Sequence, residues 1–206
     1  MTLVEDLKKL AERATGWQRP PADTVSQLLR VCKALAFRFR DDGKTPNHPF
    51  WPVLVYRSVV TLPRSFDPAA VFEDLFAQNG WGDSWRGDIY HYLHYHSRIH
   101  EVLGIARGHA RVRLGGKRGR ALVLKAGDAV LIPAGTGHQA LAASKSFMAV
   151  GAYPPSGTYD ECAPTAEDHE RALKTVPKVR RPSTDPLFGA SGPLRHLAAE
   201  ELKHGQ

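Results

Sequence analysis

The sequence predicts an all-β fold, either a sandwich or a barrel, with helices added at its N-terminal end. Short apolar segments between about residue 88 and residue 153 are separated by glycine-containing turns at regular intervals, which is typical of sandwiches and barrels. Within this region, Gly115, Gly116 and Gly119 separate ARVRL from ALVLKAG, as in two strands joined by a tight hairpin.

The bulk properties are those of a soluble globular protein. The 206 residues suffice for one domain with a sizeable core, and the hydrophobic fraction of 42% is ordinary. No segment approaches the roughly 18 apolar residues of a membrane helix, and MTLVEDLKKLAERATG lacks the apolar region of a signal peptide. Cys32 and Cys162 form neither a Cys-x-x-Cys pair nor a disulfide framework. We therefore expect a cytoplasmic protein with no membrane partner.

The formal net charge of +7 is compatible with a solvated basic surface or with nucleic-acid binding. The basic residues are scattered, apart from LKTVPKVRR near the C-terminus. No helix-turn-helix pattern or basic stretch interleaved with aromatic residues accompanies them. We therefore interpret the charge as a solvated surface and do not expect a nucleic-acid partner.

Residues 1–38 are expected to form a helical extension. Thr2 and Glu5 have the spacing of a capping box, and apolar residues then recur at the helical period. Two adjacent prolines interrupt this pattern. After them, Asp23 is placed to cap a second helix, whose apolar face would run from Val25 to Leu35.

Residues 39–155 are expected to form the barrel domain. WPVLVYRSVV is an apolar run typical of a strand. One inserted helix is predicted at about residues 67–77, with Asp67 as its N-cap and Pro68 at its first position. Residues 156–206 are rich in proline and polar side chains, and we expect them to pack on the barrel as an irregular tail.

The segment YLHYHSRIHEVLGIARG gathers several side chains that bind metals. In a strand, Tyr92, His94 and His96 share one face, because successive side chains alternate. Two neutral imidazoles at positions i and i+2 are well placed to bind one metal ion. The residues SRI can then turn the chain, and Glu101 at the start of the next strand can bring a carboxylate to the same ion.

A helix is the rival geometry, because His96 and His100 stand at i and i+4. The zinc-protease signature, however, requires His-Glu-x-x-His, whereas Glu101 here follows the second histidine, and the neighbouring residues favour a strand. A shift of one residue in the strand register would replace Glu101 by His100. A further ligand must come from elsewhere, and His138 after GDAVLIPAGTG is the candidate.

Together these segments resemble the two sequence motifs of the cupin superfamily. The first, Gly-x5-His-x-His-x3-4-Glu-x6-Gly, is matched here by His94, His96, Glu101 and Gly108. The second, Gly-x5-Pro-x-Gly-x2-His-x3-Asn, is matched by Gly127, Pro133, Gly135 and His138. There are two departures: Gly87 lies one residue too far upstream, and Ala142 replaces the final Asn. Neither position supplies a metal ligand in the family.

A narrower resemblance, to the small bacterial cupins of the YjlB type, covers about Phe37 to Leu194. It is carried by segments such as HYHSRIHEVLGIARG, AGDAVLIPAGTGHQ and TDPLFGASGPL. The resemblance implies a double-stranded β-helix (jelly-roll) barrel that holds one divalent transition metal ion, such as Fe, Mn, Ni, Co or Zn. The implied ligands are His94, His96, Glu101 and His138. They leave one or two coordination positions open to water, substrate or oxygen.

Two functions are compatible with such a site. One is a metal-dependent enzyme of the dioxygenase, isomerase or decarboxylase type that acts on a small polar molecule. The other is a non-catalytic module that binds or senses a small ligand through the same pocket. A nucleic-acid binder with a structural metal is a third and weaker alternative. A homodimer is compatible with the sequence.

No general base stands out beyond the ligands themselves. Tyr92 and His100 are the first candidates for a supporting role behind the ligands. Because strand alternation turns His100 away when Glu101 faces inward, we expect it behind the ligands or at the surface, outside the first coordination shell. Trp81 and Trp85, just before the metal-binding segment, are expected to plug or cover the barrel end.

Overall fold

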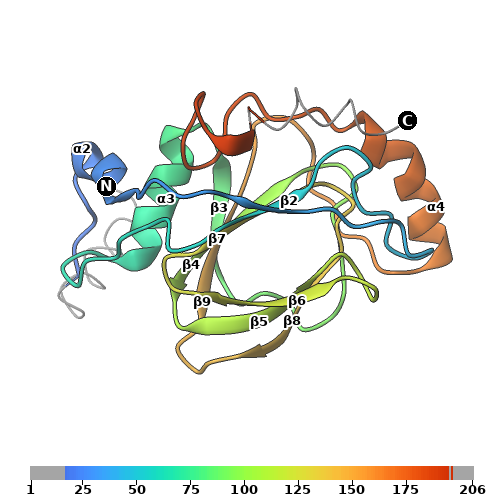
Figure 1. Cartoon of the computed structure of the whole chain (residues 1–206), viewed down its shortest axis with the longest axis horizontal. Helices are drawn as coiled ribbons and strands as arrows, with labels where there is room; N and C mark the ends of the chain where they lie inside the picture. The colour runs from blue at the N-terminus through green and yellow to red at the C-terminus, as the bar shows by residue number, and fades with distance from the viewer. Residues whose placement is uncertain (1–16, 195, 197–206) are drawn as a thin grey trace, which may run out of the picture.

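The computed structural model describes residues 17–194 and 196, in which two antiparallel sheets face one another (Figure 1). The larger sheet has six strands in the order β1-β2-β7-β4-β9-β3, and the smaller has three in the order β6-β5-β8. The strands are β1 (Leu35–Phe37), β2 (Val53–Tyr56), β3 (Gly82–Gly87), β4 (Glu101–Arg107), β5 (His109–Leu114), β6 (Arg120–Lys125), β7 (Ala129–Ile132), β8 (His138–Ala143) and β9 (Met148–Tyr153). This arrangement confirms the predicted all-β class.

An apolar core fills the space between the two sheets. The larger sheet contributes alternate residues such as Val55, Leu103 and Val130, and the smaller contributes Val112 and Leu124. Strand β5 alternates buried and more exposed residues, because only one of its faces meets the core. All four residues of β2 are buried, because the larger sheet is covered on both faces. This double coverage explains the continuous apolar run WPVLV.

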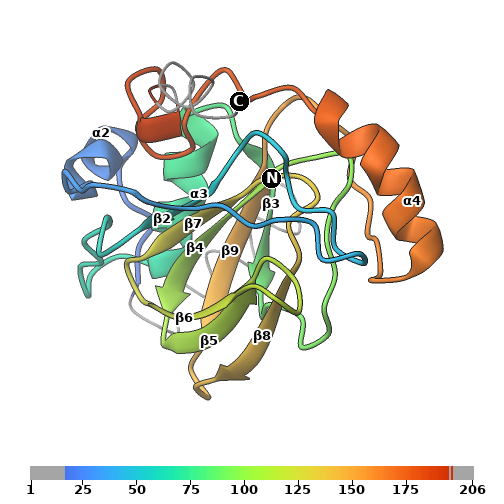
Figure 2. The same ribbon diagram turned by 45° about the vertical axis from the view of Figure 1, so that its right-hand side comes forward.

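Helix α3 (Pro68–Gln78) covers the outer face of the larger sheet (Figure 2). The Asp67 carboxylate accepts a hydrogen bond from the backbone N–H of Ala69, and Pro68 occupies the first turn, both as predicted. The Phe72 ring lies directly over Gly104 of β4, where a Cβ atom would come within 2.2 Å of it. Glycine at this position therefore lets α3 pack closely on the strand that begins with Glu101.

The second predicted N-terminal helix is wrong beyond Leu28. Helix α2 (Ala22–Val25) continues only as the 3-10 turn η1 (Ser26–Leu28), and the residues from Leu35 to Phe37 form strand β1. The backbone of the intervening segment pairs with residues 59–61: Arg30 N–H donates to the carbonyl of Val59. The segment 59–61 and the edge of β2, with which β1 pairs, thus offer backbone partners that outweigh the local helical pattern. The first predicted helix, with Thr2 and Glu5, lies outside the described residues.

The C-terminal segment is less irregular than predicted. It contains α4 (Ala166–Thr175), followed by the 3-10 turn η2 (Val176–Lys178), and Figure 2 shows α4 far from α3. The Thr165 hydroxyl accepts a hydrogen bond from Asp168 N–H and caps α4. Among the described residues, no helix is both long enough and apolar enough to cross a membrane.

Candidate metal centre

The extended segment 94–96 supplies two side chains of the candidate site. His94 pairs with His138, the first residue of β8, through backbone hydrogen bonds of 3.3 and 2.9 Å. Tyr95 pairs with Cys162 and buries its ring with that residue in a separate apolar cluster. Side chains therefore alternate along this segment as predicted, with His94 and His96 on one side and Tyr95 on the other.

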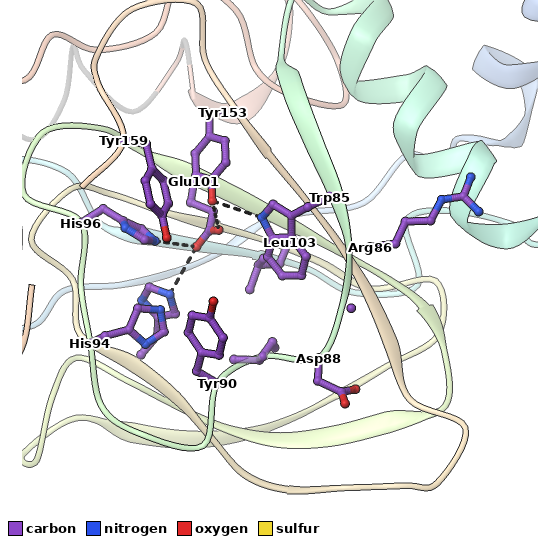
Figure 3. A pocket seen from close by; sticks show the side chains of 13 residues that line it. Trp85, Arg86, Asp88, Tyr90, His94, His96, Glu101, Leu103, Tyr153 and Tyr159 are labelled. Carbon is purple, nitrogen blue, oxygen red and sulfur yellow. Dashed lines mark hydrogen bonds and ion pairs between the residues drawn. The ribbon is translucent and has the colours of Figure 1, made fainter. Parts of the chain in front are cut away.

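The three histidines and the glutamate of the predicted ligand set lie together, although they come from three segments of the chain. The ligand nitrogens of His94, His96 and His138 lie within 4.8 Å of one another, close enough to hold one ion, and the three side chains are buried. Glu101, the first residue of β4, points toward the same place (Figure 3). Its Oε2 atom lies 3.2 Å from Nε2 of His138 and 3.5 Å from Nε2 of His96.

A backbone carbonyl oxygen orients each of the three imidazole rings through its Nδ1 atom. The carbonyls are those of Tyr92 for His94, Asp160 for His96 and Thr136 for His138. Nδ1 lies 3.3 Å from the carbonyl oxygen at His94 and 3.1 Å at His138. Because a carbonyl oxygen only accepts hydrogen bonds, Nδ1 carries the proton, and Nε2 of each neutral ring keeps a lone pair. Histidines that ligate metals are held in this way.

The Glu101 carboxylate is buried beside these rings. Burial alone would raise its pKa, but the neighbouring His138 and His96 hold the pKa below its usual value. Burial lowers the pKa of His96, and Glu101 more than reverses that effect, so the pKa of His96 lies above its usual value. When no metal ion is bound, a protonated His96 can therefore take the place of the ion as the positive partner of the Glu101 carboxylate. Burial, reinforced by His138, lowers the pKa of His94 to about 3, so His94 is neutral at pH 7.

The donor set fits a divalent transition metal ion. Oε2 of Glu101 is buried and accepts no hydrogen bond within the described part of the chain. A buried carboxylate oxygen without a donor, facing three imidazole lone pairs, is an arrangement that a cation relieves. Three nitrogen ligands and one oxygen ligand suit Fe, Mn, Ni, Co and Zn.

A cavity of about 510 Å³ opens beside these side chains (Figure 3). His94, His96, Glu101 and His138 form part of its wall. The rest of the wall is largely aromatic and aliphatic: Trp85, Ile89, Tyr90, Leu103, Tyr153 and Tyr159. A volume of this size is typical of sites for small molecules.

Sequence reasoning missed Tyr153, which fixes the glutamate. Its hydroxyl donates to Oε1 of Glu101 at 3.1 Å and accepts from Nε1 of Trp85 at 3.1 Å. The Trp85 indole lies over Gly151, where a Cβ atom would come within 2.1 Å of it. Tyr153 ends β9, and the motif spacing carries no signal for it, because the pairing of β9 with β4 and β3 brings these residues together.

Sequence reasoning also missed Asp160. Its carboxylate accepts hydrogen bonds from the backbone N–H groups of Ser97 and Arg98 and from the Ser97 hydroxyl. Its carbonyl oxygen orients His96. The segment after β9 therefore holds the turn between the two halves of the first motif.

Gly135 ties the loop before His138 to the histidine segment. Its N–H donates to the carbonyl oxygen of His96 at 2.7 Å, and its φ angle is +80°. A Cβ atom at this position would lie 2.9 Å from the Val176 side chain. Both constraints favour glycine, which explains this position of the second motif.

The two supporting candidates have different surroundings. Tyr92 is half exposed, stacks on Tyr90 with ring centroids 4.8 Å apart, and donates its hydroxyl proton to Glu161. His100 faces away from the ligand set, but it is buried and not at the surface. Its Nδ1 accepts from the N–H of Ala134, and its Nε2 lies 3.1 Å from the carbonyl oxygen of Arg180.

The two tryptophans have different positions. Trp81 is buried in the core beneath α3, with its Nε1 donating to the carbonyl of Thr184. Trp85 lies in β3 and lines the cavity. Of the two, Trp85 is therefore the one that lies beside the candidate site.

Comparisons with known proteins agree with this fold. A family model described as a cupin domain matches residues 85–150. The chain is 39% identical over 159 residues to the uncharacterized protein YjlB of Bacillus subtilis (strain 168), covering 77% of this chain and 93% of YjlB.

Solved structures share a more distant likeness. The dTDP-4-dehydrorhamnose 3,5-epimerase of Elizabethkingia anophelis is 14% identical, with a TM-score of 0.37 over 62% of this chain and 75% of that one. The acireductone dioxygenase of Bacillus anthracis, with a cadmium ion in its active centre, is 20% identical. Its TM-score is 0.32, over 42% of this chain and 59% of that one. Likeness at this level carries no argument about activity.

Proposed function

Because this chain belongs to the cupin family of Bacillus subtilis YjlB, we propose that it binds one divalent transition metal ion through His94, His96, Glu101 and His138. The cavity beside that ion binds or transforms a small polar molecule. An ion held there would act as a Lewis acid, with one or two coordination positions open to a ligand.

One observation carries the proposal. Three buried imidazoles each donate from Nδ1 to a backbone carbonyl, so three lone pairs are left to meet a carboxylate whose Oε2 receives no hydrogen bond from the described residues. A structural histidine normally uses both ring nitrogens in hydrogen bonds. The shared orientation of three such rings supports a common cation.

The surrounding residues keep this donor set in position. The carbonyl partners fix the rotation of each ring, and the Tyr153 hydroxyl fixes one oxygen of Glu101. Trp85 in turn fixes the Tyr153 hydroxyl. Aromatic and aliphatic walls limit the water around the open positions, which strengthens electrostatic contacts with a ligand.

The metal content of the purified protein tests the proposal. We expect about one equivalent of metal, by mass spectrometry, in wild-type protein from its native host, and none above background in His96→Ala. His91→Ala is the matched control, because His91 lies in the same segment with an exposed side chain. Equal metal in wild type and His96→Ala would contradict the assigned site. Turnover of small carbonyl acids, sugars or thiols by the loaded protein would then distinguish an enzyme from a binding module.

A further inference from the structure

The cavity walls restrict the chemistry of the ligand that reaches the metal centre. Tyr90 and Tyr159 stand at its mouth, each next to one histidine of the site. Tyr90 packs on His94 with ring centroids 5.2 Å apart, and Tyr159 packs on His96 at 5.0 Å. Both tyrosines are about half exposed, at 47% and 51%. Two large rings therefore present open aromatic surface at the entrance.

The inner wall offers few hydrogen-bonding groups for a ligand. The Trp85 N–H and the Tyr153 hydroxyl are already bonded, the first to Tyr153 and the second to Glu101. Ile89 and Leu103 add aliphatic surface. A sugar would bury several hydroxyl groups here without partners, which is unfavourable. The walls instead match a flat apolar body.

The charges argue against a phosphorylated ligand. Arg86 is the one Lys or Arg among the described residues that line the cavity. Its guanidinium points away from the cavity toward α3 (Figure 3) and is bound by Asp67 at 2.6 Å and by Glu73 at 2.6 and 2.8 Å. Asp88 at the mouth and Glu101 inside are both acidic. Phosphate is normally bound by a free Arg or Lys or by a helix N-terminus, and the described residues around this cavity present none of these groups to a ligand.

We propose that the cavity takes a small, planar, conjugated molecule without phosphate, whose ring packs on Tyr90 and Tyr159 while an oxygen head reaches the ion. The part of this proposal that concerns the oxygen head depends on the proposed function, the metal site. The part that concerns the ring depends on the cavity walls alone. Because His94 and His96 lie directly beside these two tyrosines, a ring stacked at the mouth would have its substituents close to the residues that would hold the ion.

Binding of 4-nitrocatechol, which combines a conjugated ring with two adjacent oxygens, tests the proposal by calorimetry. We expect it to bind the metal-loaded protein, and Tyr90→Leu to weaken binding at least fivefold. Phe50→Leu is the matched control: Phe50 is equally exposed, at 50%, but lies outside the cavity wall. This variant should bind with unchanged affinity.

Two further probes separate the ring contacts from the ion. Oxalate has two oxygen donors and no ring, so its affinity for the loaded protein should be the same in wild type and Tyr90→Leu. If oxalate does not bind and no metal is retained, the proposed function fails. Even then, the proposed ring contacts predict that 4-nitrocatechol binds weakly to the metal-free protein. Tyr90→Leu should abolish this weak binding.

Two results would overturn the inference. One is an affinity for 4-nitrocatechol that is equal in wild type and in the double variant Tyr90→Leu/Tyr159→Leu, with or without metal. The other is tighter binding of glucose 1-phosphate than of 4-nitrocatechol. Both tyrosines are half exposed, so their replacement is compatible with folding, which a thermal melt of each variant verifies.

Discussion

Two groups of buried histidines lie in the described part of the chain, and they carry their protons on opposite nitrogens. His94, His96 and His138 donate from Nδ1 to carbonyl oxygens and leave Nε2 free. His48 and His100, whose ring centroids are 5.7 Å apart, instead accept backbone N–H groups at Nδ1. A histidine that accepts at Nδ1 must carry its proton on Nε2.

The difference separates a binding site from a structural pair. Nε2 of His100 donates to the carbonyl of Arg180, so both nitrogens of His100 are used, whereas the buried Nε2 of His48 has no hydrogen-bond partner among the described residues. No carboxylate lies beside His48 or His100 among their described contacts, whereas Glu101 meets the other group. Burial and proximity of histidines are therefore insufficient to identify a metal site. The tautomer imposed by the backbone distinguishes the two groups.

The largest expected effect comes from removing one ligand. His138→Ala should weaken metal affinity by more than the 10- to 100-fold typical of losing a supporting hydrogen bond, because it deletes a nitrogen donor. Competition with a chromophoric chelator measures this loss. If His138→Ala kept the wild-type metal affinity, the distinction between the two groups would be wrong, because His138 would then bind no metal, like His100.

The opposite pattern is expected at the structural pair. His100→Leu leaves the N–H of Ala134 and the carbonyl of Arg180 without their partner, which costs about 2–5 kcal/mol of unfolding free energy. Metal stoichiometry should stay at the wild-type value. Urea unfolding together with metal analysis checks both parts, and a variant that unfolds normally but loses its metal would contradict them.

A smaller effect is expected at Tyr153. Tyr153→Phe removes the hydroxyl that donates to Glu101 and should lower metal affinity by about 10- to 100-fold. Tyr56→Phe is the matched control, because the buried Tyr56 hydroxyl donates to a different carboxylate, that of Asp185, at 2.6 Å. The control should lose stability and keep its metal affinity. Equal metal affinities in wild type, Tyr153→Phe and Tyr56→Phe would show that Tyr153 does not position Glu101 for metal binding.

The last expected effect is a dependence of stability on pH in the metal-free protein. Burial lowers the pKa of His48 to about 3 and that of His100 to about 4. The unfolded chain, in which a histidine has a pKa of about 6.5, therefore binds more protons between these values and pH 6.5. Stability should fall as the pH drops below about 6.5, on the order of 1.4 kcal/mol per pH unit for each histidine. Urea unfolding at pH 7.5, 6 and 5 checks this, and a flat profile would contradict it.

The sequence predicted the strand-dominated class and which histidines share a face, because both follow from local periodicity. Alternation alone places His94 and His96 on one side, and a turn brings Glu101 beside them. It could not predict the ring orientations, because the carbonyl that orients His96 belongs to Asp160, 64 residues later. For the same reason it missed Tyr153, which reaches Glu101 through sheet pairing.

Tertiary contacts also overruled the local pattern at the N-terminal end. The apolar spacing from Val25 to Leu35 fits a helix, but Leu35–Phe37 pairs with β2. The division into residues 1–38, 39–155 and 156–206 stays a prediction. A homodimer, the absence of a nucleic-acid partner and a cytoplasmic location also stay predictions, since they concern relations beyond a single chain.

A crystal grown with the metal found in the native protein tests the central claim most directly. An anomalous difference map at the absorption edge of that metal should contain one strong peak per chain. The peak should lie between Nε2 of the three histidines and the carboxylate of Glu101. A peak beside His48 and His100, or a fully loaded protein with no peak at the four residues, would contradict the account.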